Sequence, residues 1–352
     1  MTLRRALATV IAVAVVAAGC APDGTSGSTT TVTVYSASGL GDWYRPQFEK
    51  FTRDTGVKVS LFEAGSGEVV SRVNSRAVWQ QLDGDTSVPP ADLLVTLPPF
   101  IQRAARAGLL QPGGADSSGI PGGVTDPDGL FVPIANTALC FIANPDFTPQ
   151  PRTWDDLLDP RFKGKLQYST PGEAGAGTAL LLLLHHLMGE RGALDYLAEL
   201  QSNNVGPSPS TGELQPKVSS GQLLVANGDV QMNLSAITND GLRLNVFFPA
   251  MSDNSRTTMA IPYAAGVTAA TQRPREAKRL LAQLLSDEAQ RALYRQAFGI
   301  PVRASIEQEM SANAGPGSPT EVLNGVKLWS PDWNSVVAQI DKDLEDYRRA
   351  IG

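Results

Sequence analysis

The sequence contains few of the residues that most often carry metal or nucleophilic chemistry. Its 352 residues include two cysteines, Cys20 and Cys140, and two histidines, His185 and His186. Neighbouring side chains on a helix point about 100° apart, so the adjacent histidines cannot both bind one metal. Cys140 lies in the apolar stretch NTALCFIAN, which favours a buried, inert thiol. We therefore expect no metal site, no cofactor and no catalytic residue.

Positive charge is also scarce. The chain has 29 lysines and arginines against 35 acidic residues, a formal net charge of −6. Residues 1–19 hold two arginines and no acid, so the remainder is more acidic still. A protein that binds nucleic acid needs clustered basic residues, and no basic run exists here. Nucleic acid is excluded as a partner.

The apolar run at the N-terminus is too short to cross a membrane. Arg4 and Arg5 precede this run, which covers residues 6–19, whereas a spanning helix needs roughly 20 residues. This order is typical of a secretion signal, which we predict over residues 1–19. The ending AAGC resembles a bacterial lipobox, which implies that Cys20 is acylated and anchors the chain to the outer face of the cytoplasmic membrane. The alternative is a cleaved soluble export signal in which Cys20 has no role.

Residues 20–30 are rich in serine, threonine and glycine without apolar periodicity, which predicts a flexible tether. After the tether, apolar stretches with the period of a strand alternate with stretches that have the period of a helix. Strands are predicted at 31–39, 57–65 and 91–99, and helices at 42–56, 68–82 and 100–108. A second strand series covers 165–170, 221–229 and 243–250. Alternating strands and helices predict α/β lobes with parallel pairing, and two such lobes facing each other is the simplest arrangement.

The first three predicted strands end in small or hydroxyl-bearing residues. These ends are Ser36 to Gly39, Gly65 to Gly67, and Thr96. In open α/β sheets, ligands bind outside the carboxyl ends of the strands. The three strand ends are therefore predicted to line one side of a cleft.

The stretch QYSTPGEAGAGTA, residues 167–179, combines glycines and hydroxyls just before a predicted helix. A helix N-terminus offers unpaired N–H groups and the positive end of the helix dipole, which together favour an anion. Gly172 and Gly177 have the spacing of a P-loop, but Thr178 stands where that motif has its lysine. The loop therefore predicts anion capture without phosphoryl transfer. A glycine-rich turn that only packs a helix on a sheet is the alternative.

Six blocks of the sequence carry a resemblance to a known family. They are VTVYSASGLGDWY, FEAGSGEVVSRV, LLVTLPPFIQRAARAGLLQP, TWDDLLDPRFKGKLQYSTPGEAGAGTALLLLLHH, NNVGPSPSTGELQPKVSSGQLLVANGDVQMNL and IPYAAGV. In these blocks the chain resembles the substrate-binding proteins of bacterial ABC importers, and among them the 2-aminoethylphosphonate binders, which are related to ferric-iron and thiamine binders. Iron binders of this kind generally use adjacent tyrosines, and none of the seven tyrosines here has a tyrosine neighbour.

The resemblance implies a two-lobe periplasmic binding protein type II fold, with two crossover strands and a ligand cleft between the lobes. We expect residues 31–137 and 263–352 in the first lobe and residues 138–262 in the second, with hinges near 136–142 and 259–266. It also implies a monomer that captures a small phosphonate and delivers it to the permease and ATPase subunits of an importer. The alternative is an exported hydrolase or transferase acting on phosphate esters, although no GxSxG motif is present.

The resemblance and the strand ends together assign a set of ligand-binding residues. For the anion, Ser66, Thr211 and residues of the loop are expected, while an acid and the ring of Tyr263 would receive the amine. Glu68 and Glu173 could instead be first-turn helix acids, and Asp229 a plain N-cap. Ser38 stands where the family has an acid, and 79–90 is an added excursion. The full predicted set is Ser36, Ser38, Gly39, Ser66, Gly67, Glu68, Thr96, Ser169, Thr170, Glu173, Gly177, Thr178, Thr211, Asp229 and Tyr263.

Overall fold

The computed structural model describes residues 30–82, 90–121 and 125–352. The predicted signal peptide and nearly all of the tether, Cys20 included, lie outside the described residues. Of the predicted excursion at 79–90, only residues 79–82 and 90 are among the described residues. Residues 79–82 continue the second helix.

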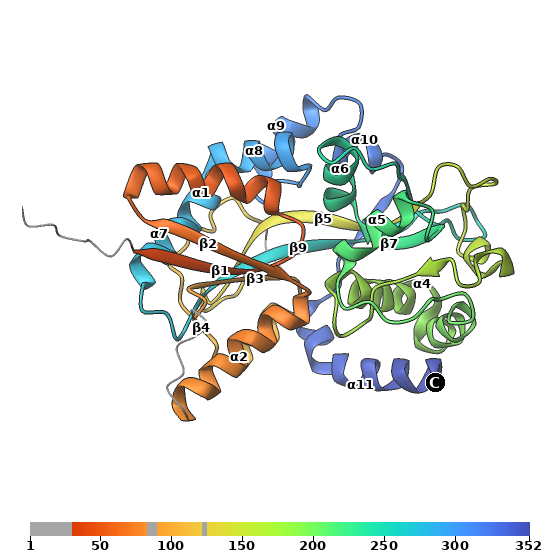
Figure 1. The fold of residues 1–352 in the computed structure, drawn as a ribbon, viewed down its shortest axis with the longest axis horizontal. Coiled ribbons are helices and arrows are strands. Elements are labelled where there is room, and N and C mark those ends of the chain that lie inside the picture. Colours follow the sequence, from red (N-terminus) through yellow and green to blue (C-terminus); the bar gives the residue numbers. More distant parts are fainter. Residues whose placement is uncertain (1–29, 83–89, 122–124) are drawn as a thin grey trace, which may run out of the picture.

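Strands and helices alternate through the first lobe as the periodicity predicts, and β strands of one sheet run through the whole molecule (Figure 1). The strands are β1 Thr31–Ala37, β2 Lys58–Ala64, β3 Leu93–Thr96, β4 Leu110–Gln111, β5 Val132–Ala143, β6 Leu166–Gln167, β7 Val225–Asp229, β8 Asn245–Phe247, β9 Thr257–Thr268 and β10 Lys327–Trp329.

The helices cover the faces of this sheet and bury their apolar sides against it. They are α1 Gly41–Thr55, α2 Ser66–Leu82, α3 Phe100–Arg106, α4 Gly175–Leu200, α5 Leu214–Ser219, α6 Val230–Thr238, α7 Pro274–Leu284, α8 Asp287–Ala297, α9 Ala304–Ala312, α10 Pro319–Val322 and α11 Trp333–Ile351.

Local chemistry sets several of these boundaries. Gly56 ends α1 in the left-handed conformation, at φ 71°. The amphipathic region 274–298 forms two helices because the Ser286 side chain accepts from the N–H of Ala289 and so caps α8. At the start of α6, Asp229 caps the helix by accepting from the N–H of Met232.

The sheet order is β2-β1-β3-β9-β5-β7-β6. β1 pairs in parallel with β2 and β3, and β6 pairs in parallel with β7, as βα units require. The long strands β5 and β9 pair antiparallel with each other. β9 also pairs antiparallel with β3, and the far end of β5 pairs antiparallel with β7. β5 and β9 run in opposite directions between the two lobes, so the sheet contains both parallel and antiparallel pairs.

The two-lobe arrangement predicted from the sequence is confirmed. In Figure 1, β1, β2, β3 and α1 lie on one side and β7, α4 and α5 on the other, with β5 and β9 running between them. The proposed lobe boundaries stay a prediction. The C-terminal helix α11 packs along α4, and its Asp341 lies 3.0 Å from Arg103 of α3, so this helix contacts both lobes.

Candidate functional site

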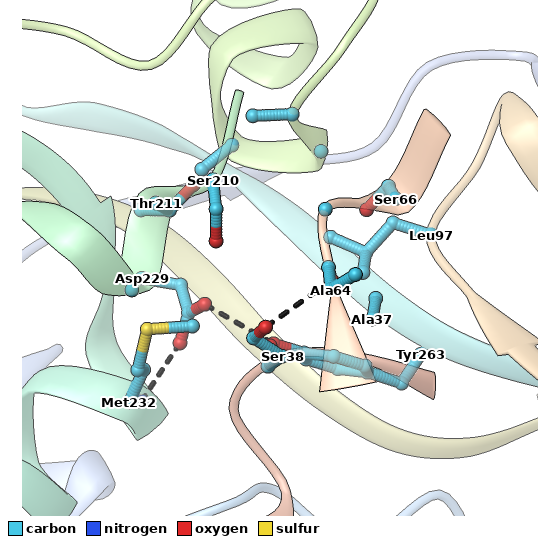
Figure 2. A pocket seen from close by; sticks show the side chains of 15 residues that line it. Ala37, Ser38, Ala64, Ser66, Leu97, Ser210, Thr211, Asp229, Met232 and Tyr263 are labelled. Atoms are coloured by element: carbon cyan, nitrogen blue, oxygen red, sulfur yellow. Dashed lines mark hydrogen bonds between the residues drawn. The ribbon is translucent and has the colours of Figure 1, made fainter. Parts of the chain in front are cut away.

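A pocket lies between the lobes, at the carboxyl ends of β1, β2 and β7. Figure 2 shows side chains of the second lobe, such as Ser210 and Asp229, facing Ser66 and Leu97 of the first lobe. The lining residues are Ala37, Ser38, Ala64, Gly65, Ser66, Leu97, Ala174, Gly175, Ala176, Ser210, Thr211, Gly212, Asp229, Met232 and Tyr263. None of these lining residues is a lysine, arginine or histidine.

Two helices begin at this pocket, one from each lobe. Ser66 opens α2, and Gly175 opens α4 directly after Ala174. A Cβ on Gly175 would stand 2.7 Å from the Ser66 hydroxyl oxygen, so the two helix starts meet closely. The first-turn N–H groups of a helix lack acceptors within that helix, and both helix dipoles have their positive ends here. This part of the pocket is suited to an anion.

Opposite the helix starts lies one buried carboxylate. Asp229 is 2% exposed and accepts hydrogen bonds from the Met232 N–H at 2.8 Å, the Thr137 hydroxyl at 3.2 Å and the Tyr263 hydroxyl at 3.3 Å. Burial raises the pKa of Asp229 to about 6, against the lowering effect of these hydrogen bonds. Among the described residues, no lysine or arginine forms an ion pair with it. A cation in the pocket would therefore stabilise its charged form.

The lobes touch each other around the pocket. The N–H of Gly67 donates to the carbonyl of Glu173 at 2.8 Å, and the Gln231 amide donates to the carbonyl of Gly39 at 2.7 Å. The cavity that remains is about 20 Å³, enough for about one water molecule. The structure is therefore a closed arrangement of the lobes, and a ligand can enter the pocket only when they separate.

Five predicted residues line the pocket: Ser38, Ser66, Thr211, Asp229 and Tyr263. Two predicted glycines lie beside it and allow close approach of the backbone. Gly39 has a φ of 130°, and a Cβ there would be 2.5 Å from the Tyr263 hydroxyl oxygen. On Gly67, a Cβ would be 3.0 Å from the Glu173 carbonyl oxygen.

Other predicted residues support the pocket without lining it. The Ser36 hydroxyl bonds to the Ala37 carbonyl and the Tyr44 hydroxyl, and the Thr96 hydroxyl donates to the Ser66 carbonyl. Four more belong to the loop before α4 and the start of that helix: Ser169, Thr170, Gly177 and Thr178. Thr178 accepts from the N–H of Gly172 and donates to the Ala174 carbonyl, so its hydroxyl closes this loop on itself.

The two predicted glutamates lie outside the pocket lining. Glu68 is exposed and forms an ion pair with Arg72 at 2.9 Å, four residues further along α2. Glu173 is also exposed, and it contributes its backbone carbonyl to the contact with Gly67. Of the three acids considered for an amine, Asp229 is the one that the structure brings to the pocket.

Sequence reasoning missed several residues that line or border the pocket. Ser210 directly precedes the predicted Thr211, and its hydroxyl type was a usable signal. Met232 lies in the first turn of α6, three residues after the cap residue Asp229, whose side chain its N–H bonds. Gln231 borders the pocket through its contact with Gly39, and no sequence signal pointed to it.

The chain is similar to known proteins over most of its length. Residues 32–299 match the family described as bacterial extracellular solute-binding protein. The chain belongs to this family. A Salmonella typhimurium protein with the provisional name 2-aminoethylphosphonate-binding periplasmic protein is 40% identical over 327 residues, which cover 91% of this chain and 92% of that protein.

Solved structures of periplasmic binding proteins share the fold. The periplasmic binding protein P5PA has a TM-score of 0.76 at 20% identity, covering 92% of this chain and all of that one. A periplasmic thiamin binding protein has a TM-score of 0.72 at 18% identity, covering 95% of this chain and all of that one. The predicted family and type II fold are thereby confirmed, and family members act outside the cytoplasm.

The described residues offer neither a metal site nor a membrane-spanning helix. No cluster of three or more histidine, cysteine or acidic side chains within the described ranges could hold a metal ion. No helix in the described part of the chain has the length and apolar character needed to cross a membrane.

Proposed function

We propose that this solute-binding protein captures a small zwitterionic phosphonate, of which 2-aminoethylphosphonate is the leading candidate, and delivers it to an ABC importer. One observation carries the proposal: two helix N-termini and several hydroxyls face a single buried carboxylate across one pocket. An anion at the helix starts and an ammonium at Asp229 would complement both ends. The provisional name of the 40%-identical relatives supports the same ligand.

The contacts between the lobes support capture by closure. An open form would admit the ligand, and β5 and β9, which run between the lobes, would flex to close on it. The permease and ATPase subunits of the importer would read the closed form. This role requires no chemistry on the ligand, so we propose a non-catalytic monomer held to the outer face of the cytoplasmic membrane through acylated Cys20.

Calorimetry with purified protein tests the proposed ligand. We expect 2-aminoethylphosphonate to bind at least tenfold more tightly than ethylphosphonate, because a hydrogen bond to a charged group contributes about 1.5–3 kcal/mol. Equal affinities would mean that no amine site exists and that the protein is a general phosphonate receptor. Binding of neither compound would overturn the proposal.

The enzyme alternative is separated by a second measurement. A phosphate ester incubated with the protein should release no phosphate above background, whereas a bound phosphonate should raise the melting temperature by linkage. Turnover that scales with protein concentration would favour the hydrolase or transferase alternative.

A further inference from the structure

Gln231 has a buried oxygen without a hydrogen-bond partner. The side chain is 1% exposed, and its Oε1 has no partner within the described residues. Its backbone N–H donates to the Thr137 hydroxyl at 3.0 Å, which holds the start of α6 in place. Leaving a buried acceptor unsatisfied costs about 1–3 kcal/mol. A buried polar atom of this kind calls for a hydrogen-bond partner.

The orientation of the Gln231 amide follows from its other contact. Its Nε2 donates to the carbonyl of Gly39 at 2.7 Å, and only the NH₂ group of an amide can donate to a carbonyl. Reversing the amide would bring two oxygens together. The unpartnered atom is therefore an acceptor, and its missing partner is a donor.

This acceptor lies beside the carboxylate end of the pocket. A Cβ built on Gly39 would be 2.5 Å from the Tyr263 hydroxyl oxygen and 3.4 Å from Gln231 Oε1, so both atoms lie close to the same point beside Gly39. The Tyr263 hydroxyl in turn lies 2.9 Å from the Ser38 carbonyl and 3.3 Å from Asp229. Carboxylate, carbonyl and amide oxygens thus gather at one end, which suits a group with several N–H donors.

We infer that Gln231 is a specificity-determining residue: its Oε1 accepts a hydrogen bond from the ligand ammonium while its Nε2 holds Gly39 of the first lobe. An ammonium carries three donors and needs more acceptors than Asp229 alone supplies. Linked hydrogen bonds polarise each other, so the bond from the ammonium strengthens the bond to Gly39. Recognition of the amine is thereby coupled to lobe closure. The inference rests on the proposed function.

Two variants separate the acceptor from the closure contact. Gln231→Leu removes both, whereas Gln231→Glu keeps an oxygen acceptor and loses the amide donor. Calorimetry with 2-aminoethylphosphonate and ethylphosphonate gives the preference for the amine as a ratio of affinities. We expect Gln231→Leu to lower this ratio at least tenfold. Gln231→Glu should keep the ratio or raise it, because its carboxylate still accepts from the ammonium and adds a negative charge. Gln111→Leu is the matched control, because this amide also donates to a backbone carbonyl but lies on β4, away from the pocket.

The outcomes distinguish the inference from the proposed function. If the wild type prefers the amine and Gln231→Leu keeps the full preference, the inference is wrong and the proposed function stands. A wild type that binds neither compound, or both equally, overturns the ammonium site and this inference with it. A loss of preference in Gln231→Leu and Gln231→Glu alike would show that the closure contact, and not the acceptor, sets specificity.

Discussion

The negative charge of Asp229 favours binding of a cation but lowers the stability of the ligand-free fold. Its pKa is raised to about 6 by burial, so the folded protein holds a proton there that the unfolded chain releases near pH 4. The titratable groups that face it are Tyr263 on β9 and Cys140 on β5, and burial raises the pKa of both. Both stay neutral at ordinary pH. The charge of Asp229 is therefore destabilising until a cation joins it.

We predict that the stability contribution of Asp229 is full below about pH 4 and is lost as the pH rises through about 6. The shift from 3.8 corresponds to at most about 3 kcal/mol. Asp229→Asn should remove this pH-dependent loss of stability. Without ligand, the variant should therefore be more stable than the wild type at pH 8. Denaturant unfolding at several pH values measures it, with the exposed Asp240→Asn as control. Parallel pH profiles for wild type and Asp229→Asn would contradict the prediction.

Ser66 should affect binding of the anionic end of the ligand and not of its amine. Its hydroxyl lines the pocket at the start of α2, and a hydrogen bond to a charged group contributes about 1.5–3 kcal/mol. Ser66→Ala should therefore weaken 2-aminoethylphosphonate and ethylphosphonate alike, by roughly tenfold to a hundredfold. Exposed Ser60 on β2 supplies the control variant. Calorimetry that finds unchanged affinities would move the anion away from the helix start.

At the scale of the element, α4 begins where its glycines let it approach the preceding loop. A Cβ on Gly177 would stand 2.0 Å from the carbonyl oxygen of Ser169, which is backbone and cannot move aside cheaply. Thr178 then closes the loop through Gly172 and Ala174. The glycine-rich turn is thus required for packing, and it also brings Gly175 to the pocket. The packing interpretation therefore describes this loop, and anion binding at its helix start stays a prediction.

Replacing glycine by alanine in a helix normally stabilises by about 0.5–1 kcal/mol. Gly177→Ala should do the opposite and destabilise by about 2 kcal/mol or more, because overpacking against backbone strains the loop. Gly192→Ala, later in α4, meets only the Met188 Cβ at 3.3 Å and should change stability little. Thermal unfolding of the two variants compares them directly. Equal stabilities would mean that the loop relaxes freely.

At the scale of the whole molecule, a polar contact outside the pocket joins the lobes. Asp42 of α1 accepts from Ser235 and from Asn239, the latter at 2.8 Å, next to the C-terminal end of α6. The hydrogen bonds from these two side chains lower the pKa of Asp42 despite the raising effect of its partial burial. We expect this contact to stabilise the closed form, and none of its three residues lines the pocket.

Removing that contact should reduce the closed population. Asp42→Ala is expected to weaken both phosphonates by the same factor, about threefold to tenfold, because apparent affinity scales with the fraction of competent protein. Small-angle scattering should show a larger radius of gyration for the ligand-free variant than for the wild type. Asp195→Ala, which removes an exposed ion pair with Arg191 on α4, is the control. Unequal losses for the two ligands would place Asp42 in ligand recognition.

The proposed anchor is also a property of the whole chain. Several acyl chains hold a protein on a membrane where one chain binds only reversibly. Cys20→Ser should therefore release the protein into the medium, whereas the wild type should enter the detergent phase of a detergent partition. A wild type found in the aqueous phase would contradict the lipoprotein prediction.

The sequence by itself determined the elements, their order and the family. Apolar periodicity and turn residues act locally, so β1, α1 and β2 were predictable from stretches of a dozen residues. The family blocks then implied two lobes with a cleft between them. The strand-end rule placed Ser38 and Ser66 near that cleft, and the resemblance added Asp229 as a candidate for the amine.

Only the tertiary structure decided which polar groups remain available to a ligand. Ser36 and Ser38 lie on adjoining parts of one strand end, yet the Ser36 hydroxyl is bound to Tyr44 away from the pocket, whereas Ser38 lines the pocket while its hydroxyl donates to the Ala64 carbonyl. Thr178 is used by its own loop, while the Gln231 oxygen lacks a partner among the described residues. The physical reason is that the partners of a buried polar atom come from distant parts of the chain. Its free hydrogen-bonding capacity therefore exists only once those parts have packed together.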